Sequence, residues 1–147
     1  MRFETSVDIA APAETVWHVL VDVERWPEWT RSMQRVQILG GGALAVGSRV
    51  RVKQPGLGSM VYRVTELAPE HSFTWVAGRG GVTATAAHQV SATPGGGVRV
   101  RLGVDLTGPL GPLMSVLLGG RTRRYIEMEA QGLERRSETG RGEPGRT

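Results

Sequence analysis

Two neighbouring segments in the last third of the sequence alternate between two kinds of residue. In 82–93 and in 97–107 the even-numbered residues are mostly apolar: Val82, Ala84, Ala86, His88, Val90, Ala92, and Val98, Val100, Leu102, Val104, Leu106. The other parity is mainly polar, and a period of two is that of a strand with one face on a core and the other in water. Pro94 to Gly97 supplies a turn between them. The pattern predicts an antiparallel hairpin and a β-rich fold.

Further extended segments are separated by clusters of glycine and proline. Residues 2–10 alternate cleanly, and the remaining predicted strands are 33–39, 48–54, 59–67 and 71–78. Between the first two strands, Pro12 suits the start of a helix whose apolar positions to Val23 follow helical spacing. Asp22 can cap a second short helix through Trp26. We therefore expect one strand, two short helices and a six-stranded antiparallel meander.

A long helical pattern follows the last predicted strand and runs to about Arg136. Its apolar stripe comprises Leu110, Leu113, Met114, Leu117 and Met128, with Leu118 and Tyr125 at the edge. The pair Gly119–Gly120 lies inside this pattern and predicts a kink, a break or a close backbone approach. Residues 137–147 lack apolar side chains, which predicts a flexible tail after a single domain of residues 1–136.

Composition excludes several classes of protein. The 147 residues suit one domain, no apolar run approaches the roughly 18 residues of a membrane span, and cysteine is absent. No apolar run of a signal peptide follows Met1, so we expect a cytoplasmic protein without membrane insertion. The net charge is +4, but the basic cluster 121–124 has acids nearby and belongs to no nucleic-acid-binding motif. Three scattered histidines and the lack of a phosphate loop predict neither metal nor cofactor.

Three short segments carry a resemblance to a known family. They are Val7-Asp8-Ile9-Ala10-Ala11-Pro12-Ala13-Glu14-Thr15-Val16-Trp17, Asp22-Val23-Glu24-Arg25-Trp26-Pro27-Glu28-Trp29 and Val64-Thr65-Glu66-Leu67-Ala68-Pro69. Together with the order of elements, they resemble the SRPBCC superfamily, also called START-like or helix-grip, and within it the bacterial polyketide cyclase/dehydrase and lipid transport branch. The resemblance covers about residues 2–136.

This resemblance implies an α+β helix-grip fold, in which a curved antiparallel sheet of about seven strands wraps round the long C-terminal helix. It also implies an apolar cavity for a polyketide-like, aromatic or lipid molecule. Members range from enzymes to carriers and co-chaperones without a shared catalytic motif, so the fold alone leaves the chemistry open. Three tryptophans, Trp17, Trp26 and Trp29, are interpreted as anchors of the two short helices on the sheet edge, and the alternative is that one of them lines the ligand.

Two residues are candidates for chemistry. His88 shares the inward parity of small alanines that leave space, so it could donate to a ligand carbonyl or act as a general base. The alternative is a hydrogen-bonded interior histidine. Arg121 lies near the centre of the predicted stripe and could bind a carboxylate, enolate or phenolate at the cavity mouth. The alternative is an arginine whose stem covers apolar surface while its guanidinium reaches solvent.

The remaining candidate ligand contacts are Tyr62, Trp75, Met114, Leu117 and Tyr125. The parity of Trp75 points it inward, whereas the two faces of strand 59–67 are hard to distinguish. Three functions stay open: a cyclase or dehydratase with His88 as acid/base and Arg121 as oxyanion partner, a carrier or sensor without catalysis, or a protein-interaction module. A hydrophobic small molecule is the expected partner, and both a monomer and a homodimer are compatible with the sequence.

Overall fold

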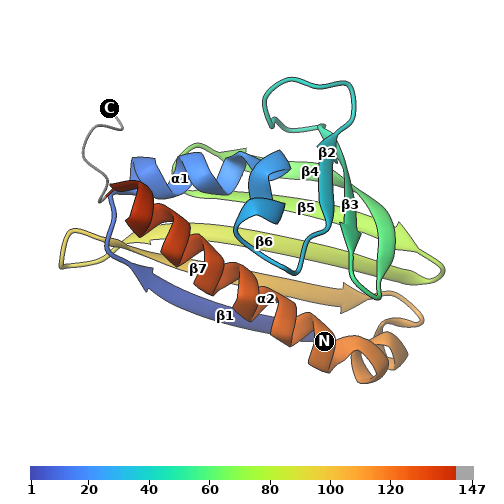
Figure 1. Cartoon of the computed structure of the whole chain (residues 1–147). Coiled ribbons are helices and arrows are strands. Elements are labelled where there is room, and N and C mark those ends of the chain that lie inside the picture. The colour runs from blue at the N-terminus through green and yellow to red at the C-terminus, as the bar shows by residue number, and fades with distance from the viewer. Residues whose placement is uncertain (142–147) are drawn as a thin grey trace.

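The computed structural model describes residues 1–141 and shows one curved antiparallel sheet holding a long helix (Figure 1). The elements, in chain order, are β1 Arg2–Ile9, α1 Ala13–Val21, η1 Val23–Glu28, β2 Arg35–Ile38, β3 Arg49–Gln54, β4 Gly58–Ala68, β5 Ser72–Arg79, β6 Val82–Ala92, β7 Val98–Thr107 and α2 Gly111–Arg141. This arrangement confirms the predicted helix-grip fold, with every predicted strand present within about two residues of its expected ends.

The sheet has the order β1-β7-β6-β5-β4-β3-β2, and every pair is antiparallel. Strands β2 to β7 therefore form a meander, which β1 closes by pairing with β7. A register shift between Val64 and Glu66 in β4 adds local curvature. Helix α2 runs across the concave face and packs on β1 and β7 (Figure 1). The space between α2 and the strands β3 to β6 is left for side chains and a cavity.

The inner face of the sheet follows the predicted parity. Ala84, Ala86, His88 and Val90 are buried on β6, and Val98, Val100, Leu102 and Leu106 are buried on β7. The structure also resolves the ambiguous strand, because Tyr62 and Val64 of β4 are buried while Val61 and Arg63 face outward. The outer face of β1 and β7 is polar and carries an exposed ion pair between Asp8 and Arg99.

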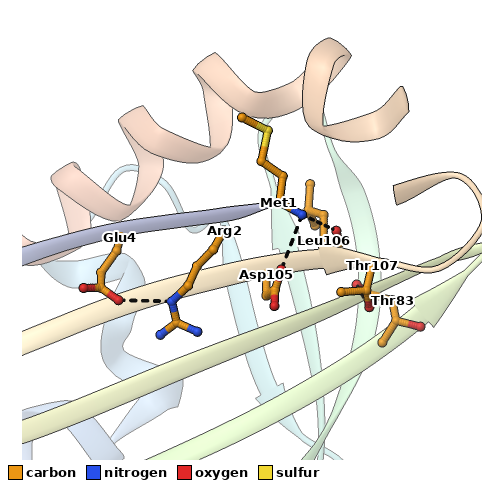
Figure 2. Close-up of polar contacts among 7 residues, drawn as sticks. All are labelled: Met1, Arg2, Glu4, Thr83, Asp105, Leu106 and Thr107. Carbon is orange, nitrogen blue, oxygen red and sulfur yellow. Dashed lines mark hydrogen bonds and ion pairs between the residues drawn. The ribbon is translucent and has the colours of Figure 1, made fainter. Parts of the chain in front are cut away.

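The N-terminus is tied to the edge of the sheet beside the start of α2. The Met1 amino group donates to the Leu106 carbonyl oxygen at 3.0 Å and lies 3.5 Å from an Asp105 carboxylate oxygen (Figure 2). Arg2 pairs with Glu4 on one side of β1, and the Met1 side chain extends from the other side toward α2 (Figure 2). Strand β1 is therefore held by main-chain pairing, by its terminal charge and by surface ion pairs.

The two short helices bring an aromatic side chain over the sheet. Helix α1 follows Pro12, as predicted, and the second helix is a 3-10 helix that continues to Glu28 rather than ending at Trp26. The indole N–H of Trp26 donates to the Leu20 carbonyl oxygen at 3.0 Å. This bond fixes Trp26 between the end of α1 and the inner face of the sheet, where it is almost fully buried.

The apolar stripe predicted for α2 is wrong in its first half. Leu110, Leu113 and Leu117 are exposed, whereas the buried positions there are Gly111, Ser115 and Gly119. Small residues face the sheet because the helix lies close to β1: a Cβ on Gly119 would approach the Phe3 ring to 3.0 Å. The glycine pair thus marks a close approach, one of the three predicted outcomes, and the helix runs through it without a break.

The end of α2 also differs from the prediction of about Arg136. The helix continues to Arg141, Ser137 is fully buried, and the Ala10 main-chain N–H donates to a Glu138 carboxylate oxygen at 2.8 Å. The first residues of the predicted tail are thus part of the helix, because they pack beside the end of β1. The rest of that tail, residues 142–147, lies outside the described residues.

Candidate functional site

A cavity of about 220 Å³ lies between the inner face of the sheet and α2. Its wall is mostly aliphatic and aromatic, with contributions from η1, β3 to β7 and α2. The α2 residues on the wall extend from Met114 to Glu129, a separation of about 22 Å along a helix axis. The cavity is therefore elongated along α2, with Met114 and Leu118 toward one end and Glu129 toward the other.

His88 lines this cavity from β6 and is buried. Its Nδ1 atom lies 3.1 Å from the Phe73 carbonyl oxygen, and its ring stacks on that of Phe73 with centroids 4.1 Å apart. Because a carbonyl oxygen only accepts hydrogen bonds, Nδ1 carries the proton and Nε2 is left as an acceptor. Burial lowers the pKa of His88 to about 4, against the smaller opposing effect of the Phe73 carbonyl. The imidazole is therefore neutral at physiological pH.

Glu129 is a buried carboxyl group on the cavity wall, and it projects from α2. Burial raises its pKa to about 8, although the hydrogen bond from Ser32 acts in the opposite direction. Most Glu129 side chains are therefore protonated at pH 7. A neutral carboxyl group can donate one hydrogen bond as well as accept, which an ionised carboxylate cannot do. The cavity thus contains a proton donor within largely apolar surroundings.

Two hydroxyl groups support Glu129 from the segment after η1. The Ser32 hydroxyl lies 3.3 Å from a Glu129 carboxyl oxygen, and the Thr30 and Ser32 hydroxyls are 2.7 Å apart. If Ser32 donates to Glu129, its oxygen is free to accept the Thr30 proton, which gives a chain of three polar side chains. All three are buried, so the chain satisfies groups that would otherwise lack partners.

Aromatic rings form the wall near these polar groups. Trp26, Tyr62 and Trp75 line the cavity, and the Trp75 ring centroid lies 5.4 Å from those of both Trp26 and Tyr62. The rings of Trp26 and Trp75 also meet the His88 imidazole, at 5.6 and 5.5 Å. Burial, and to a lesser extent the charge of Glu129, raises the pKa of Tyr62 to about 12. The phenol therefore keeps its proton.

Arg121 does not occupy the place that the sequence predicted for it. It is exposed, it is not on the cavity wall, and its guanidinium donates to the Gly56 carbonyl oxygen at 3.1 Å. One turn later, the Tyr125 hydroxyl donates to the Pro55 carbonyl oxygen, and the Tyr125 side chain also lines the cavity. The two residues thus fasten the β3–β4 turn to α2. The guanidinium is used to hold the border of the cavity rather than to face its interior.

Of the other ligand contacts predicted on α2, one lies on the cavity wall and one does not. Met114 lies on the cavity wall, but Leu117 is exposed and does not line the cavity. The predictions for Leu117 and Arg121 are wrong for the same reason. The sequence pattern places the largest apolar residues of α2 toward the sheet, whereas the side that meets the sheet carries small residues. Of the predicted residues, the structure brings Tyr62, Trp75, His88, Met114 and Tyr125 to one cavity and leaves Leu117 and Arg121 outside it.

The sequence-based predictions do not include Glu129 or its partners Ser32 and Thr30, and they give a position on the cavity wall for Trp26 only as the alternative to an anchoring role. A signal for Glu129 was present, because it lies three residues after Ile126 and four before Leu133, on one helical face. A carboxyl group on a buried face is costly unless it is neutral or paired. The wrong helical phase concealed this signal. Ser32 and Thr30 lie in an irregular segment, where periodicity carries no information.

Comparisons with known proteins agree with this architecture. The family model described as polyketide cyclase / dehydrase and lipid transport matches residues 1–138. The Zhui aromatase/cyclase of a Streptomyces species superposes with a TM-score of 0.82 at 17% identity, covering 100% of this chain and 99% of that one. A START superfamily protein from Mycobacterium smegmatis gives 0.72 at 20% identity, covering 94% and 97%.

A di-domain aromatase/cyclase, StfQ of the steffimycin biosynthetic pathway, superposes with a TM-score of 0.76 at 12% identity. The superposition covers 97% of this chain and 52% of that one. At these identities the structural likeness concerns the fold alone. No curated protein matches the chain by sequence.

Proposed function

This chain belongs to the polyketide cyclase/dehydrase and lipid transport family, and on that premise we propose that it binds an apolar, ring-containing or acyl molecule that carries a carbonyl group. The carbonyl oxygen lies at the Glu129 end of the cavity, and the apolar part extends toward Met114 and Leu118. The observation that carries the proposal is a buried, predominantly neutral carboxyl group on an otherwise largely apolar wall.

The size and lining of the cavity support a small apolar ligand. A dry cavity of about 150 Å³ is known to accept one benzene ring, and this cavity measures about 220 Å³. Aromatic walls from Trp26, Tyr62 and Trp75 suit a planar ligand, because offset or edge-on ring contacts add to the energy of burial. Few polar groups interrupt the wall, so those present determine which way round the ligand binds.

The same groups support proton transfer on a bound carbonyl compound. Near pH 8 the carboxylate of Glu129 removes a proton from the carbon beside the carbonyl, which leaves an enolate. The enolate carbon attacks a second carbonyl group of the same ligand molecule, and a C–C bond forms. The new alkoxide then takes the proton from Glu129. Loss of this hydroxyl with an adjacent proton releases water. The pKa of about 8 suits this cycle, because a general base works best near the operating pH.

His88 has a different role in this proposal from the acid/base role expected from the sequence. A pKa of about 4 makes its imidazole a weak base at pH 7. Its Nε2 atom accepts a hydrogen bond, so it suits a hydroxyl or enol of the ligand. Glu129 is thus the proton-transfer group and His88 a binding group.

Binding is tested with Nile red, a neutral fluorescent carbonyl compound, titrated between about pH 6 and pH 9. Because the donor is lost when Glu129 ionises, we expect the affinity to fall about tenfold through pH 8, the worth of one hydrogen bond in a buried site. Glu129→Gln keeps a donor at every pH and should remove this dependence. Glu127→Gln, a change of the same type on the exposed side of α2, is the matched control and should behave like the native protein.

Catalysis is tested separately with benzoylacetone, an aromatic 1,3-diketone, by following exchange of its α-protons for deuterium. The native protein should accelerate the exchange, and Glu129→Gln should lower the accelerated rate by about 100-fold or more. Tight binding of Nile red without acceleration of exchange would favour a carrier. Absence of both binding and exchange would refute the proposed function and favour an interaction module.

A further inference from the structure

The first two turns of α2 are apolar on every side. Residues 113–118 read Leu-Met-Ser-Val-Leu-Leu. Met114 and Leu118 face the cavity and Ser115 faces the sheet, yet Leu113, Val116 and Leu117 remain exposed by 51%, 80% and 63%. A helix that is apolar all round is normally covered on all sides. The outward side of these turns is therefore exposed, although its composition is typical of a buried surface.

This outward side adjoins the border of the cavity. The cavity wall includes Leu57 from the β3–β4 turn and Arg79 and Val82 beside the β5–β6 turn, as well as Met114 and Leu118. Leu110 continues the apolar surface to the β5–β6 turn, since a Cβ on Gly81 would lie 3.2 Å from its side chain. One short stretch of α2 thus separates the cavity from an exposed apolar surface.

Positive charge follows directly after the apolar turns. Residues 106–126 contain no Asp or Glu, and Arg121, Arg123 and Arg124 lie one turn beyond Leu117. Arg123 and Arg124 are exposed, and the guanidinium of Arg123 lies 5.5 Å from the Phe3 ring centroid. We call Leu110, Leu113, Val116, Leu117 and these three arginines the mouth patch. It combines exposed apolar side chains with three basic residues, and Glu127 is the first acidic residue after them.

We propose that the mouth patch docks this protein on the surface of a bilayer that contains anionic lipids. The leucines and Val116 enter the boundary between headgroups and acyl chains, and the arginines meet lipid phosphates. No helix among the described residues is long and apolar enough to cross a membrane, so the docking is peripheral. The cavity border then faces the bilayer, and an apolar ligand can pass between the two without crossing water. This inference goes beyond ligand binding.

Charge favours a bilayer over a second copy of this chain. In a two-fold symmetric dimer the same patch meets itself, so one interface would contain the three arginines of each copy. Like charges gathered in one interface oppose association. An anionic surface instead attracts each arginine and covers the apolar side chains.

The test is flotation with vesicles of about 70% phosphatidylcholine and about 30% phosphatidylglycerol, against pure phosphatidylcholine. The native protein should float with the anionic vesicles, and binding should weaken as NaCl rises from about 0.1 to about 0.5 M. Val116→Asp should lower the partition coefficient by about tenfold or more, because an apolar side chain is replaced by a charge. Arg124→Gln should lower it by about fivefold, the worth of one basic residue near an anionic surface.

Matched controls lie away from the patch. Val46→Asp changes another strongly exposed valine, in the β2–β3 loop, and Arg63→Gln changes an exposed arginine on the outer face of β4. Both should float like the native protein. Leu113→Ser provides a milder second variant, and circular dichroism checks the folding of each. The vesicles contain no ligand, so this test stands or falls independently of the proposed binding of Nile red.

Three results would overturn the proposal. The first is no flotation of the folded native protein with either vesicle. The second is equal loss of binding in Val46→Asp and Val116→Asp, which would show an effect of charge alone. The third is a dimer of the native protein in analytical ultracentrifugation that is lost in Val116→Asp. This result would assign the patch to a second copy and would equally refute bilayer docking.

Discussion

The two halves of α2 form one continuous helix, but they differ in which residues face the sheet and which face outward. In the first half, Gly111–Arg124, small residues pack against the sheet, while Leu113, Val116 and Leu117 face outward. In the second half, from Tyr125 to Ser137, Ile126, Ala130 and Leu133 are buried and the outward side is polar. The first half borders the cavity at its apolar end, whereas the second half carries the buried Glu129. We infer that the second half anchors the helix and supplies the chemistry, and the first half covers the cavity.

This contrast also explains how a polar group is kept inside the protein. Glu129 has its hydroxyl partners on the segment after η1, and that segment is held against α2 by close packing at Gly132, where a Cβ would clash with the main chain of Trp29. Rigid surroundings preserve the hydrogen bonds and the high pKa of Glu129. At the border of the two halves, the side chains of Arg121 and Tyr125 fasten the β3–β4 turn to the helix by one hydrogen bond each.

The largest expected difference between the halves is in the effect of truncating a leucine. Leu133→Ala should lower the free energy of unfolding by about 2–5 kcal/mol, because Leu133 is fully buried and the change leaves a cavity. Leu117→Ala should change it by less than about 0.5 kcal/mol, since Leu117 is exposed. Urea denaturation measures both. Equal losses would contradict the division of α2 into an anchor and a cover.

The second prediction concerns pH. Burial raises the pKa of Glu129 from 4.5 to about 8, so between these values the folded protein binds a proton that the unfolded chain does not. Relative to Glu129→Gln, the free energy of unfolding should therefore fall as pH rises, by about 2 kcal/mol between about pH 6 and pH 8. The lowered pKa of His88 acts in the opposite direction and at lower pH, and it is common to both proteins.

The exposed Glu127→Gln variant is the control for this comparison. Its free energy of unfolding should follow that of the native protein at every pH. If native protein and Glu129→Gln show the same pH dependence in urea denaturation, Glu129 is not held neutral by burial, and the proton-transfer role fails with it.

The glycines of α2 should respond in opposite directions. Gly132→Ala should lower the free energy of unfolding by about 1–2 kcal/mol, because the new methyl group meets the main chain of Trp29 and neither backbone can move freely. Gly120→Ala should raise it by up to about 1 kcal/mol, since Gly120 has open space and alanine favours the helix. Thermal denaturation distinguishes the two. A stabilising Gly132→Ala would mean that the second half is more loosely packed than described.

The smallest expected effect is at the fastening of the β3–β4 turn. Tyr125→Phe removes the hydroxyl that bonds to the Pro55 carbonyl oxygen and should lower the free energy of unfolding by about 1 kcal/mol. The turn should then open more readily, so Nile red should associate and dissociate faster with little change in its equilibrium affinity. Stopped-flow fluorescence measures these rates. Unchanged rates would place ligand entry elsewhere than beside the β3–β4 turn.

Much of the fold was predictable because strand periodicity is local. Alternation in 82–93 and 97–107 predicted the inward side of β6 and β7, including the buried position of His88. The candidate site was less predictable. Ionisation of Glu129 depends on burial by segments distant in sequence, and its hydrogen-bond partner Ser32 is 97 residues away. No local pattern contains that pairing.

The order of elements, the meander and the inward parity of its strands were determined by the sequence itself, through turn residues and a period of two that leaves only one way to bury a strand. The phase of α2 was decided only by the tertiary structure. An isolated helix with leucines on one side and small residues on another does not specify which side meets the sheet. The close approach of α2 to Phe3 at Gly119 required small residues there, and it turned Leu113 and Leu117 outward.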